Sequence, residues 1–244
     1  MTLLTLDIQE SMTKVFLRLM IGGNMAILSI ASAKGGCGKT TTAILLGAEL
    51  ALERYKVALL DCDLNQHASA FGTKAQIDNL TIIANIGESN ILSTLKETEN
   101  RHDLILIDLP GGSSTLALKA LQRSHFVIVP TQASLPDVRD AMKTIAQIDD
   151  AQDLARATIE RVMLWTRFLP GFESKSARHV RQSLEGQGVG ILNSVLMERS
   201  AFREIHITGK VPRQLDPTSA ATANISAMAE EVIKHLSKLT EIAA

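Results

Sequence analysis

Short apolar runs recur along this chain and alternate with longer segments in which apolar residues return every three or four positions. Seven runs have the length of buried strands, at residues 27–31, 57–60, 80–84, 104–108, 126–132, 161–167 and 189–196. Helical periodicity is found at residues 41–54, 89–99, 137–150, 174–186 and 226–239. This alternation is typical of a mostly parallel sheet with helices on both faces. We therefore predict a three-layer α/β fold built on a seven-stranded sheet.

The composition fits one globular domain. The chain has 244 residues, of which 45% are hydrophobic, and a net charge of −1, values that are ordinary for a domain with a sizeable core. We expect residues 25–244 to form a single domain, and residues 1–24 to be an upstream start or a docking segment. No run approaches the roughly 18 apolar residues of a membrane-spanning helix. The two cysteines do not indicate a disulfide framework.

A glycine-rich stretch directly after the first predicted strand carries the clearest chemistry. Residues 33–41 read Ala-Lys-Gly-Gly-Cys-Gly-Lys-Thr-Thr and lead into a helix, which is the context of a phosphate-binding loop. Glycines let backbone N–H groups converge on phosphate oxygens, and the helix N-terminus adds partial positive charge. Lys39 is expected to reach the β- and γ-phosphates, and the Thr40 hydroxyl to bind Mg²⁺. The predicted nucleotide-binding residues are Gly35, Gly36, Cys37, Gly38, Lys39, Thr40 and Thr41.

Lys34 narrows the class, because an ordinary P-loop has no charged residue near its start. With Lys34 included, the stretch resembles the deviant Walker A motif of the ParA/MinD family, which is a SIMIBI-like group of P-loop ATPases. The resemblance implies ATP and Mg²⁺ as ligands and a homodimer in the ATP state, in which Lys34 contacts the nucleotide of the partner subunit. It also implies that Lys34 and Lys39 act in catalysis, and that Thr166 and Pro212 contact the nucleotide.

Three aspartates follow predicted strands, where side chains of a parallel sheet point into the ligand crevice. Asp108 closes the apolar run at residues 104–108, as a Walker B carboxylate does, and would hold a Mg²⁺-bound water. The family has Asp-x-Asp-Pro-Gln-Gly after its second strand. By this resemblance Asp63 is the catalytic residue that orients the attacking water, and Asp61 supports the Mg²⁺. Residues 64–66 read Leu-Asn-Gln instead of Pro-Gln-Gly, a departure that bears on the rate of hydrolysis more than on nucleotide binding.

Residues 110–112, Pro-Gly-Gly, follow Asp108 closely and form a pliable turn able to sense the γ-phosphate. We call this turn the switch loop.

Positive charge is concentrated between residues 161 and 213, which hold nine Lys/Arg and four Asp/Glu. Cationic side chains that neutralise DNA phosphates give a sequence-independent, salt-sensitive affinity. The family resemblance likewise implies non-specific DNA binding through basic residues in this part of the chain. The predicted DNA-binding residues are Arg178, Arg181, Arg199, Arg203, Lys210 and Arg213. A membrane-docking role of the MinD type is not favoured, because the last predicted helix carries as many glutamates as lysines and lacks aromatic residues.

The resemblance is closest to the short plasmid-partition ParA proteins and to the ParA-like protein of T-DNA transfer. We therefore expect a weak, cytoplasmic, nucleoid-associated ATPase that drives DNA partition with a ParB-like or centromere-binding partner. A nucleotide-gated recruitment or positioning protein for conjugative transfer or another cargo, with little hydrolysis, is the alternative. Metabolic P-loop enzymes such as dethiobiotin synthetase-like ligases share the fold, but Lys34 speaks against them.

Overall fold

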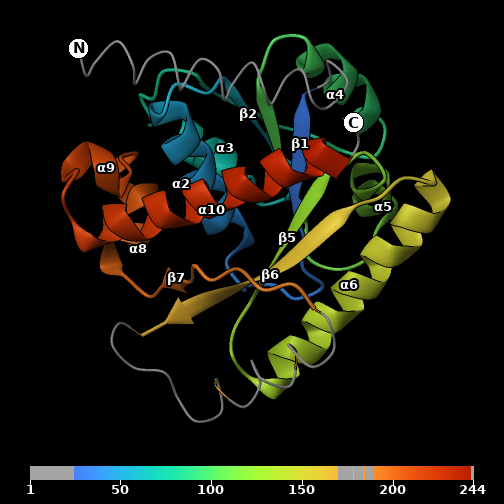
Figure 1. The fold of residues 1–244 in the computed structure, drawn as a ribbon. Helices are drawn as coiled ribbons and strands as arrows, with labels where there is room; N and C mark the ends of the chain where they lie inside the picture. The colour runs from blue at the N-terminus through green and yellow to red at the C-terminus, as the bar shows by residue number, and fades with distance from the viewer. Residues whose placement is uncertain (1–24, 170–177, 179–183, 185–188, 243–244) are drawn as a thin grey trace.

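A computed structural model describes residues 25–169, 178, 184 and 189–242 of the chain. It contains a seven-stranded sheet with the order β3-β2-β4-β1-β5-β6-β7, in which every pair of neighbours is parallel. The strands are β1 (Ala26–Ile30), β2 (Val57–Asp61), β3 (Leu80–Ile83), β4 (Leu104–Asp108), β5 (Phe126–Thr131), β6 (Glu160–Phe168) and β7 (Leu196–Met197). The chain therefore has the three-layer α/β fold that the hydrophobic pattern predicts (Figure 1).

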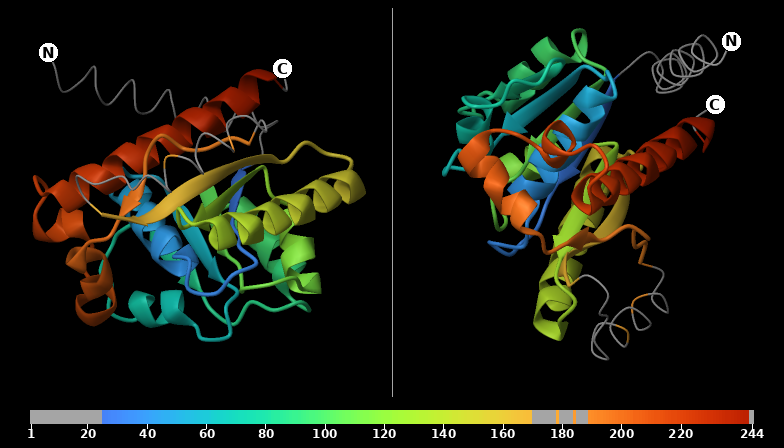
Figure 2. Two further views of the ribbon diagram at one scale, coloured as in Figure 1. Left: turned by 90° about the horizontal axis from the view of Figure 1, so that it is seen from below. Right: turned by 90° about the vertical axis from the view of Figure 1, so that its left-hand side faces the viewer.

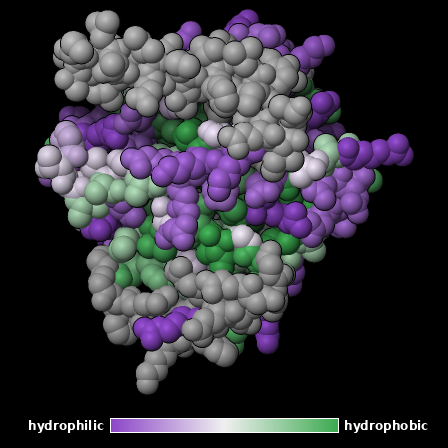
Figure 3. All heavy atoms as spheres, viewed as in Figure 1, coloured by the Kyte–Doolittle hydropathy of each residue, from purple (hydrophilic) through white to green (hydrophobic). Residues whose placement is uncertain are grey.

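Helices cover both faces of the sheet, as Figures 1 and 2 show. One layer contains α2 (Lys39–Leu52), α3 (His67–Gly72), α8 (Ser200–Thr208), α9 (Pro212–Leu215) and α10 (Ala220–Ile242). The opposite layer contains α4 (Ile91–Glu99), α5 (Thr115–Leu121) and α6 (Leu135–Ala155). Each layer is amphipathic toward the sheet, so that polar side chains face outward. In Figure 3, hydrophilic side chains run along the outer face of α10, and hydrophobic ones gather below it over β6.

The alternation of side chains along each strand builds a separate hydrophobic core on each face. In β4, Leu104 and Leu106 pack into the core shared with α2 and α10, whereas Ile105 and Ile107 pack into the core shared with α5 and α6. Because all four side chains are fully buried, this strand reads as a continuous apolar run, which is typical of a parallel sheet covered on both sides.

The predicted seventh strand, at residues 189–196, is wrong in extent. Only Ile191 forms an isolated bridge, with Met163, and the paired segment β7 is confined to Leu196–Met197. The reason lies in α10, whose Glu231 carboxylate accepts hydrogen bonds from the backbone N–H groups of Asn193 and Ser194, at 2.8 and 2.7 Å. These groups are therefore satisfied by a side chain and not by a neighbouring strand.

Several helices also begin or end at residues other than those that the periodicity predicts. The last helix begins at Ala220, six residues before the predicted start, because the Ser219 hydroxyl caps it by accepting a hydrogen bond from the Thr222 N–H. The helix α6 begins at Leu135, next to the capping residue Ser134, and extends to Ala155. Short helices α3, α5, α8 and α9 were not predicted. The predicted helix at residues 174–186 lies outside the described residues except for Arg178 and Leu184.

Candidate nucleotide-binding site

The glycine-rich loop joins the end of β1 to the start of α2. Gly36 has φ of 73° and Gly38, the residue that precedes α2, has φ of 101°. Both values lie in the left-handed region that side chains with a Cβ rarely adopt, so glycine is required at these two positions. The loop is thereby folded back onto the helix N-terminus, where backbone N–H groups have no helical partner. This is the geometry of a phosphate-binding P-loop.

Lys39, the first residue of α2, is buried and lies inside the loop. Its Nζ atom donates a hydrogen bond to the carbonyl oxygen of Lys34 at 3.2 Å. A Cβ atom placed on Gly111 of the switch loop would lie 3.6 Å from the same Nζ and 3.6 Å from the Gly35 nitrogen. The switch loop therefore packs directly against the P-loop and its lysine.

Asp61 is the last residue of β2, and Asp108 is the last residue of β4. These two strands are neighbours in the sheet, and the two aspartates pair in register. Both are fully buried, but their surroundings differ. One Asp61 oxygen accepts hydrogen bonds from the N–H and hydroxyl of Ser69, each at 2.8 Å, and the other accepts from the Asp63 N–H at 3.2 Å. Asp61 thus positions the Asp63 loop, and both of its carboxylate oxygens already accept hydrogen bonds within the chain.

Asp108 has no hydrogen-bond partner for either carboxylate oxygen among the described residues. Burial raises the pKa of this carboxyl to about 7, although the nearby Thr40 hydroxyl and Lys39 ammonium act in the opposite direction. A buried carboxylate without partners is costly unless a cation or donor compensates it. Asp108 and Thr40 therefore fit the predicted Mg²⁺ site better than Asp61 does.

We expect the substitution Asp108→Asn to stabilise the nucleotide-free protein at alkaline pH. An ordinary carboxyl ionises near pH 4, whereas Asp108 stays protonated to about pH 7 in the folded state. The wild type therefore loses stability as the pH rises between these values, and the loss persists above pH 7. The melting temperature of the variant should exceed that of the wild type clearly at pH 8 and only slightly at pH 5. Equal differences at both pH values would contradict this account. Binding of Mg²⁺-ATP should be weakened in the same variant.

Asp63 lies on the loop between β2 and α3, two residues after Asp61. Its Oδ1 atom accepts hydrogen bonds from both the backbone N–H and the side-chain amide of Asn65, at 2.9 Å each. Gln66 donates to the Asp63 carbonyl oxygen at 2.6 Å and accepts from the Asn85 N–H at 2.9 Å. Leu64, between these residues, is 95% exposed. The unusual residues 64–66 thus hold the Asp63 loop in a defined conformation and leave one apolar side chain in solvent.

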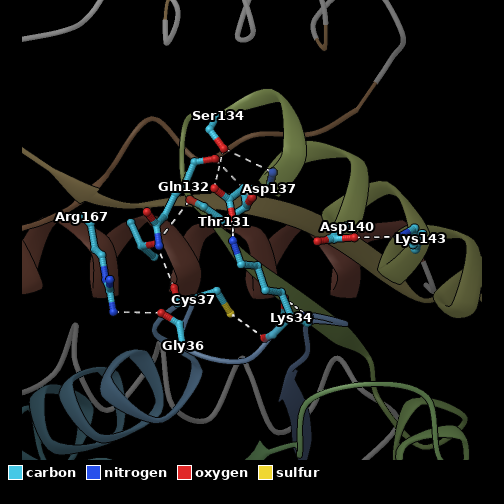
Figure 4. Close-up of polar contacts among 12 residues, drawn as sticks. Lys34, Gly36, Cys37, Thr131, Gln132, Ser134, Asp137, Asp140, Lys143 and Arg167 are labelled. Atoms are coloured by element: carbon cyan, nitrogen blue, oxygen red, sulfur yellow. Dashed lines mark hydrogen bonds and ion pairs between the residues drawn. The ribbon is translucent and has the colours of Figure 1, made fainter.

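Lys34 does not point freely into solvent. Its ammonium group forms an ion pair with Asp137 in the first turn of α6, and the Ser134 hydroxyl donates to the same carboxylate at 2.5 Å (Figure 4). The hydrogen bond with Asp137 raises the pKa of Lys34. Although burial favours neutral Asp137, the bonds with Lys34 and Ser134 hold the pKa of its carboxyl below the usual value. In this state Lys34 is engaged within its own chain.

Two residues near the end of β6 donate hydrogen bonds to backbone carbonyl oxygens of the P-loop. The Thr166 hydroxyl donates to the Cys37 carbonyl oxygen at 2.9 Å. The Arg167 guanidinium donates to the Gly36 carbonyl oxygen, also at 2.9 Å (Figure 4). Thr166 was predicted to lie at the site, whereas Arg167 was missed. Its position at the carboxyl end of a predicted strand was a signal that could have found it, because these ends meet at the ligand edge of a parallel sheet.

A hollow of about 290 Å³ opens beside the P-loop, between β6 and α8. Gly38, Thr41 and Thr166 line it on one side, and Arg199 and Arg203 on the other. The Arg199 Nε atom is buried and has no hydrogen-bond partner among the described residues. Pro212, by contrast, is buried at the start of α9 and does not line this hollow.

The predicted DNA-binding residues differ in exposure and in their ion pairs. Arg178 and Lys210 are exposed, and Arg181 lies outside the described residues. Arg203 is 72% exposed at its side chain and pairs with Glu198 at 3.2 Å. Arg213 is different, because its guanidinium forms ion pairs with Glu49 of α2 and with Glu53, the residue that follows this helix. We therefore leave Arg213 out of the proposed DNA-binding set.

The all-parallel sheet, the P-loop after β1 and the carboxylates that end β2 and β4 define a P-loop protein of the ParA/MinD type. The profile of the VirC1 protein family matches residues 25–244. The chain therefore belongs to the VirC1 family. No helix in the described part of the chain has both the length and the apolar character needed to cross a bilayer.

Comparisons with individual proteins agree with this assignment. The chain is 28% identical to the "Protein ParA" of Rhizobium radiobacter over 222 residues, which cover 89% of this chain and 99% of that protein. It is also 28% identical to the "Protein virC1" of Rhizobium radiobacter over 232 residues, covering 89% of this chain and all of that protein. Among solved structures, the ATP complex of a McdA variant from Cyanothece has a TM-score of 0.67 and 18% identity, over 87% of this chain and 96% of that one.

Proposed function

We propose that this chain is an ATPase that dimerises when it binds ATP, binds DNA without sequence preference and drives the partition of plasmid or other DNA. The observation that carries the proposal is the convergence of Lys39 and the buried Asp108 carboxylate, which accepts no hydrogen bond within the geometric limits among the described residues, on a P-loop whose rim bears a second lysine, Lys34. Lys39 and Asp108 are suited to bind a nucleoside triphosphate and its metal ion. Lys34 is suited to contact the nucleotide of a second subunit.

Each residue has a separate role in this proposal. The P-loop N–H groups and Lys39 bind the phosphates, and Thr40 and Asp108 would hold Mg²⁺, which supplies charge neutralisation when bound. Asp63 orients the water that attacks the γ-phosphate. The hollow beside Thr166 offers space for the base, so that Arg199 and Arg203 lie near the nucleotide as well as near the proposed DNA surface.

Exposed apolar side chains at the rim of the site support a dimer that forms face to face across the nucleotides. Leu64, next to Asp63, is 95% exposed, and Leu135, two residues before Asp137, is 57% exposed. A second subunit placed over the site would remove both side chains from water, which favours association. The dimer interface would then include Lys34, whose side chain is 41% exposed.

The dimer would bind DNA phosphates through the exposed basic residues Arg178, Arg203 and Lys210, together with Arg181 and Arg199. A ParB-like or centromere-binding partner would stimulate hydrolysis and release the dimer from the nucleoid. ATP would bind the dimer more tightly than the monomer, and it therefore shifts the population toward the DNA-bound state. This shift ends when the ATP is hydrolysed. DNA affinity should accordingly require ATP and fall as salt is raised.

The test is gel filtration of the wild type and of Asp63→Ala with ATP and Mg²⁺, with and without duplex DNA. We expect the variant, which binds ATP but cannot position the water, to elute as a stable dimer that co-elutes with DNA. The wild type should do so only transiently, and neither protein should dimerise with ADP. A variant that remains monomeric at saturating ATP would contradict the proposal.

A second candidate is a nucleotide-gated recruitment protein for conjugative transfer that hydrolyses ATP barely at all. The hydrogen bonds from Asn65 that occupy one oxygen of Asp63 favour it. Phosphate release distinguishes the two functions, because a recruitment protein should show no stimulation by DNA together with a partner, whereas a partition ATPase should.

A further inference from the structure

A groove of about 740 Å³ lies on the opposite helical layer from α10, between α5 and α6. These two helices lie side by side in Figure 1. Ala117, Leu118 and Leu121 of α5 form its apolar floor, and Leu154 of α6 stands at its edge with 63% of its surface exposed. An accessible apolar groove of this size is a candidate docking surface.

The charged residues that line the groove are acidic. Asp150 and Asp153 are three apart on α6 and so lie on the same face of the helix. Their neighbour Asp149 pairs with Arg161 at 2.5 Å, but no ion pair engages Asp150 or Asp153 in the part of the chain that the structure describes. The groove therefore combines an apolar floor with a negative rim, which complements a segment that carries leucine-like side chains beside lysines or arginines.

The same helix connects this groove with the nucleotide site. Near its start, Asp137 pairs with Lys34, and two turns later the Thr144 hydroxyl accepts a hydrogen bond from the Ala33 N–H of the P-loop at 2.8 Å. Gln147 then donates to the hydroxyl of Ser113, which directly follows the switch loop and also lines the groove. An occupant of the groove would thus touch the residue that follows Gly112, at the loop that packs on Lys39.

We propose that the groove between α5 and α6 binds a basic, apolar-faced segment of the partner protein. The inference rests on the proposed function, in which a partner acts on this chain, and it adds the position and the chemistry of the contact. Leucine-like side chains enter between Leu118 and Leu154, and lysine or arginine side chains pair with Asp150 and Asp153. Docking there reaches Ser113, the residue next to the switch loop, so the partner acts directly beside the element proposed to sense the γ-phosphate.

The test uses the full chain without nucleotide and two labelled helical peptides, one with leucines on one face and lysines on the other, and one with glutamates in place of the lysines. Fluorescence anisotropy measures binding. We expect the wild type to prefer the lysine peptide. The double substitution Asp150→Lys with Asp153→Lys should weaken the lysine peptide about tenfold and should make the glutamate peptide the better ligand.

The matched control is Asp78→Lys with Glu230→Lys, which changes the net charge equally at two exposed positions outside the groove. It should bind both peptides as the wild type does. Equal loss of binding in both double variants would overturn the proposal, because only total charge would then matter. Self-association of the wild type that the groove variant abolishes would also overturn it, in favour of a second copy. Because nucleotide is omitted, a failure of ATP-dependent dimerisation would contradict the proposed function and leave this result standing.

Discussion

Replacing Lys34 by alanine is expected to abolish ATP-dependent dimerisation while each protomer still binds ATP. The phosphate contacts within a protomer come from the P-loop backbone and Lys39, whereas Lys34 lies at the rim, with its side chain 41% exposed, next to the proposed dimer face. Loss of a cation that pairs with a phosphate across a closed interface costs roughly 2–5 kcal/mol. Because a symmetric dimer loses two such contacts, the protein concentration needed for half-maximal dimer should rise at least about a thousandfold, as sedimentation or light scattering with ATP would measure.

Because Lys34 pairs with Asp137, we expect the substitution Asp137→Asn to strengthen dimerisation, which is the opposite of the effect of Lys34→Ala. Lys34 must leave Asp137 before it can serve a neighbouring subunit, so removal of the carboxylate should favour the dimer. Exposed ion pairs are weak, but a symmetric dimer must break two of them, so the expected gain in dimer affinity is on the order of tenfold. Lys143→Ala is a suitable control, because Lys143 pairs with Asp140 on the same helix and is 69% exposed. Dimerisation of Lys34→Ala at the wild-type concentration would contradict a contact between subunits.

The second large effect is expected for Arg213→Ala, which should lower the free energy of unfolding by about 2–3 kcal/mol. Arg213 lies 2.5 Å from the carboxylate of Glu49, which is only 3% exposed, and also pairs with Glu53. Burial raises the pKa of Glu49, while the hydroxyl of Ser226 and Arg213 act in the opposite direction. Removing the guanidinium leaves a buried carboxylate without its cation and loosens α9 and α10 from α2. Urea unfolding measures the change.

Arg203→Ala is the matched control for Arg213→Ala. Arg203 pairs with Glu198 at the surface, and exposed ion pairs contribute less than about 1 kcal/mol, so its removal should leave unfolding nearly unchanged. In the proposed function it should instead weaken ATP-dependent DNA binding. The reverse pattern, with Arg213→Ala stable but deficient in DNA binding, would return Arg213 to the DNA-binding surface and remove its structural role.

The fold and the location of the P-loop were predictable because both depend on local signals. Apolar runs between helical segments specify a parallel sheet, and the carboxyl ends of parallel strands meet at one edge whatever the details of packing. Asp108 and the P-loop therefore had to come together once β1 and β4 were recognised. Residues 189–196 show where this reasoning fails. Their apolar pattern favours a strand, but the Glu231 carboxylate of a distant helix binds the backbone there.

The sequence by itself determined the three-layer α/β architecture, the glycines with positive φ in the P-loop, and the aspartates that end β2 and β4, because each follows from periodicity or from contiguous residues. Only the tertiary structure decided which charges meet. Lys34 pairs with Asp137, 103 residues away, Arg213 turns to α2, and the acidic groove forms where α5 and α6 pack. Such pairings depend on the position and orientation of each helix on the sheet. The packing of many side chains on both faces sets these positions, and it leaves no periodic signal in the sequence.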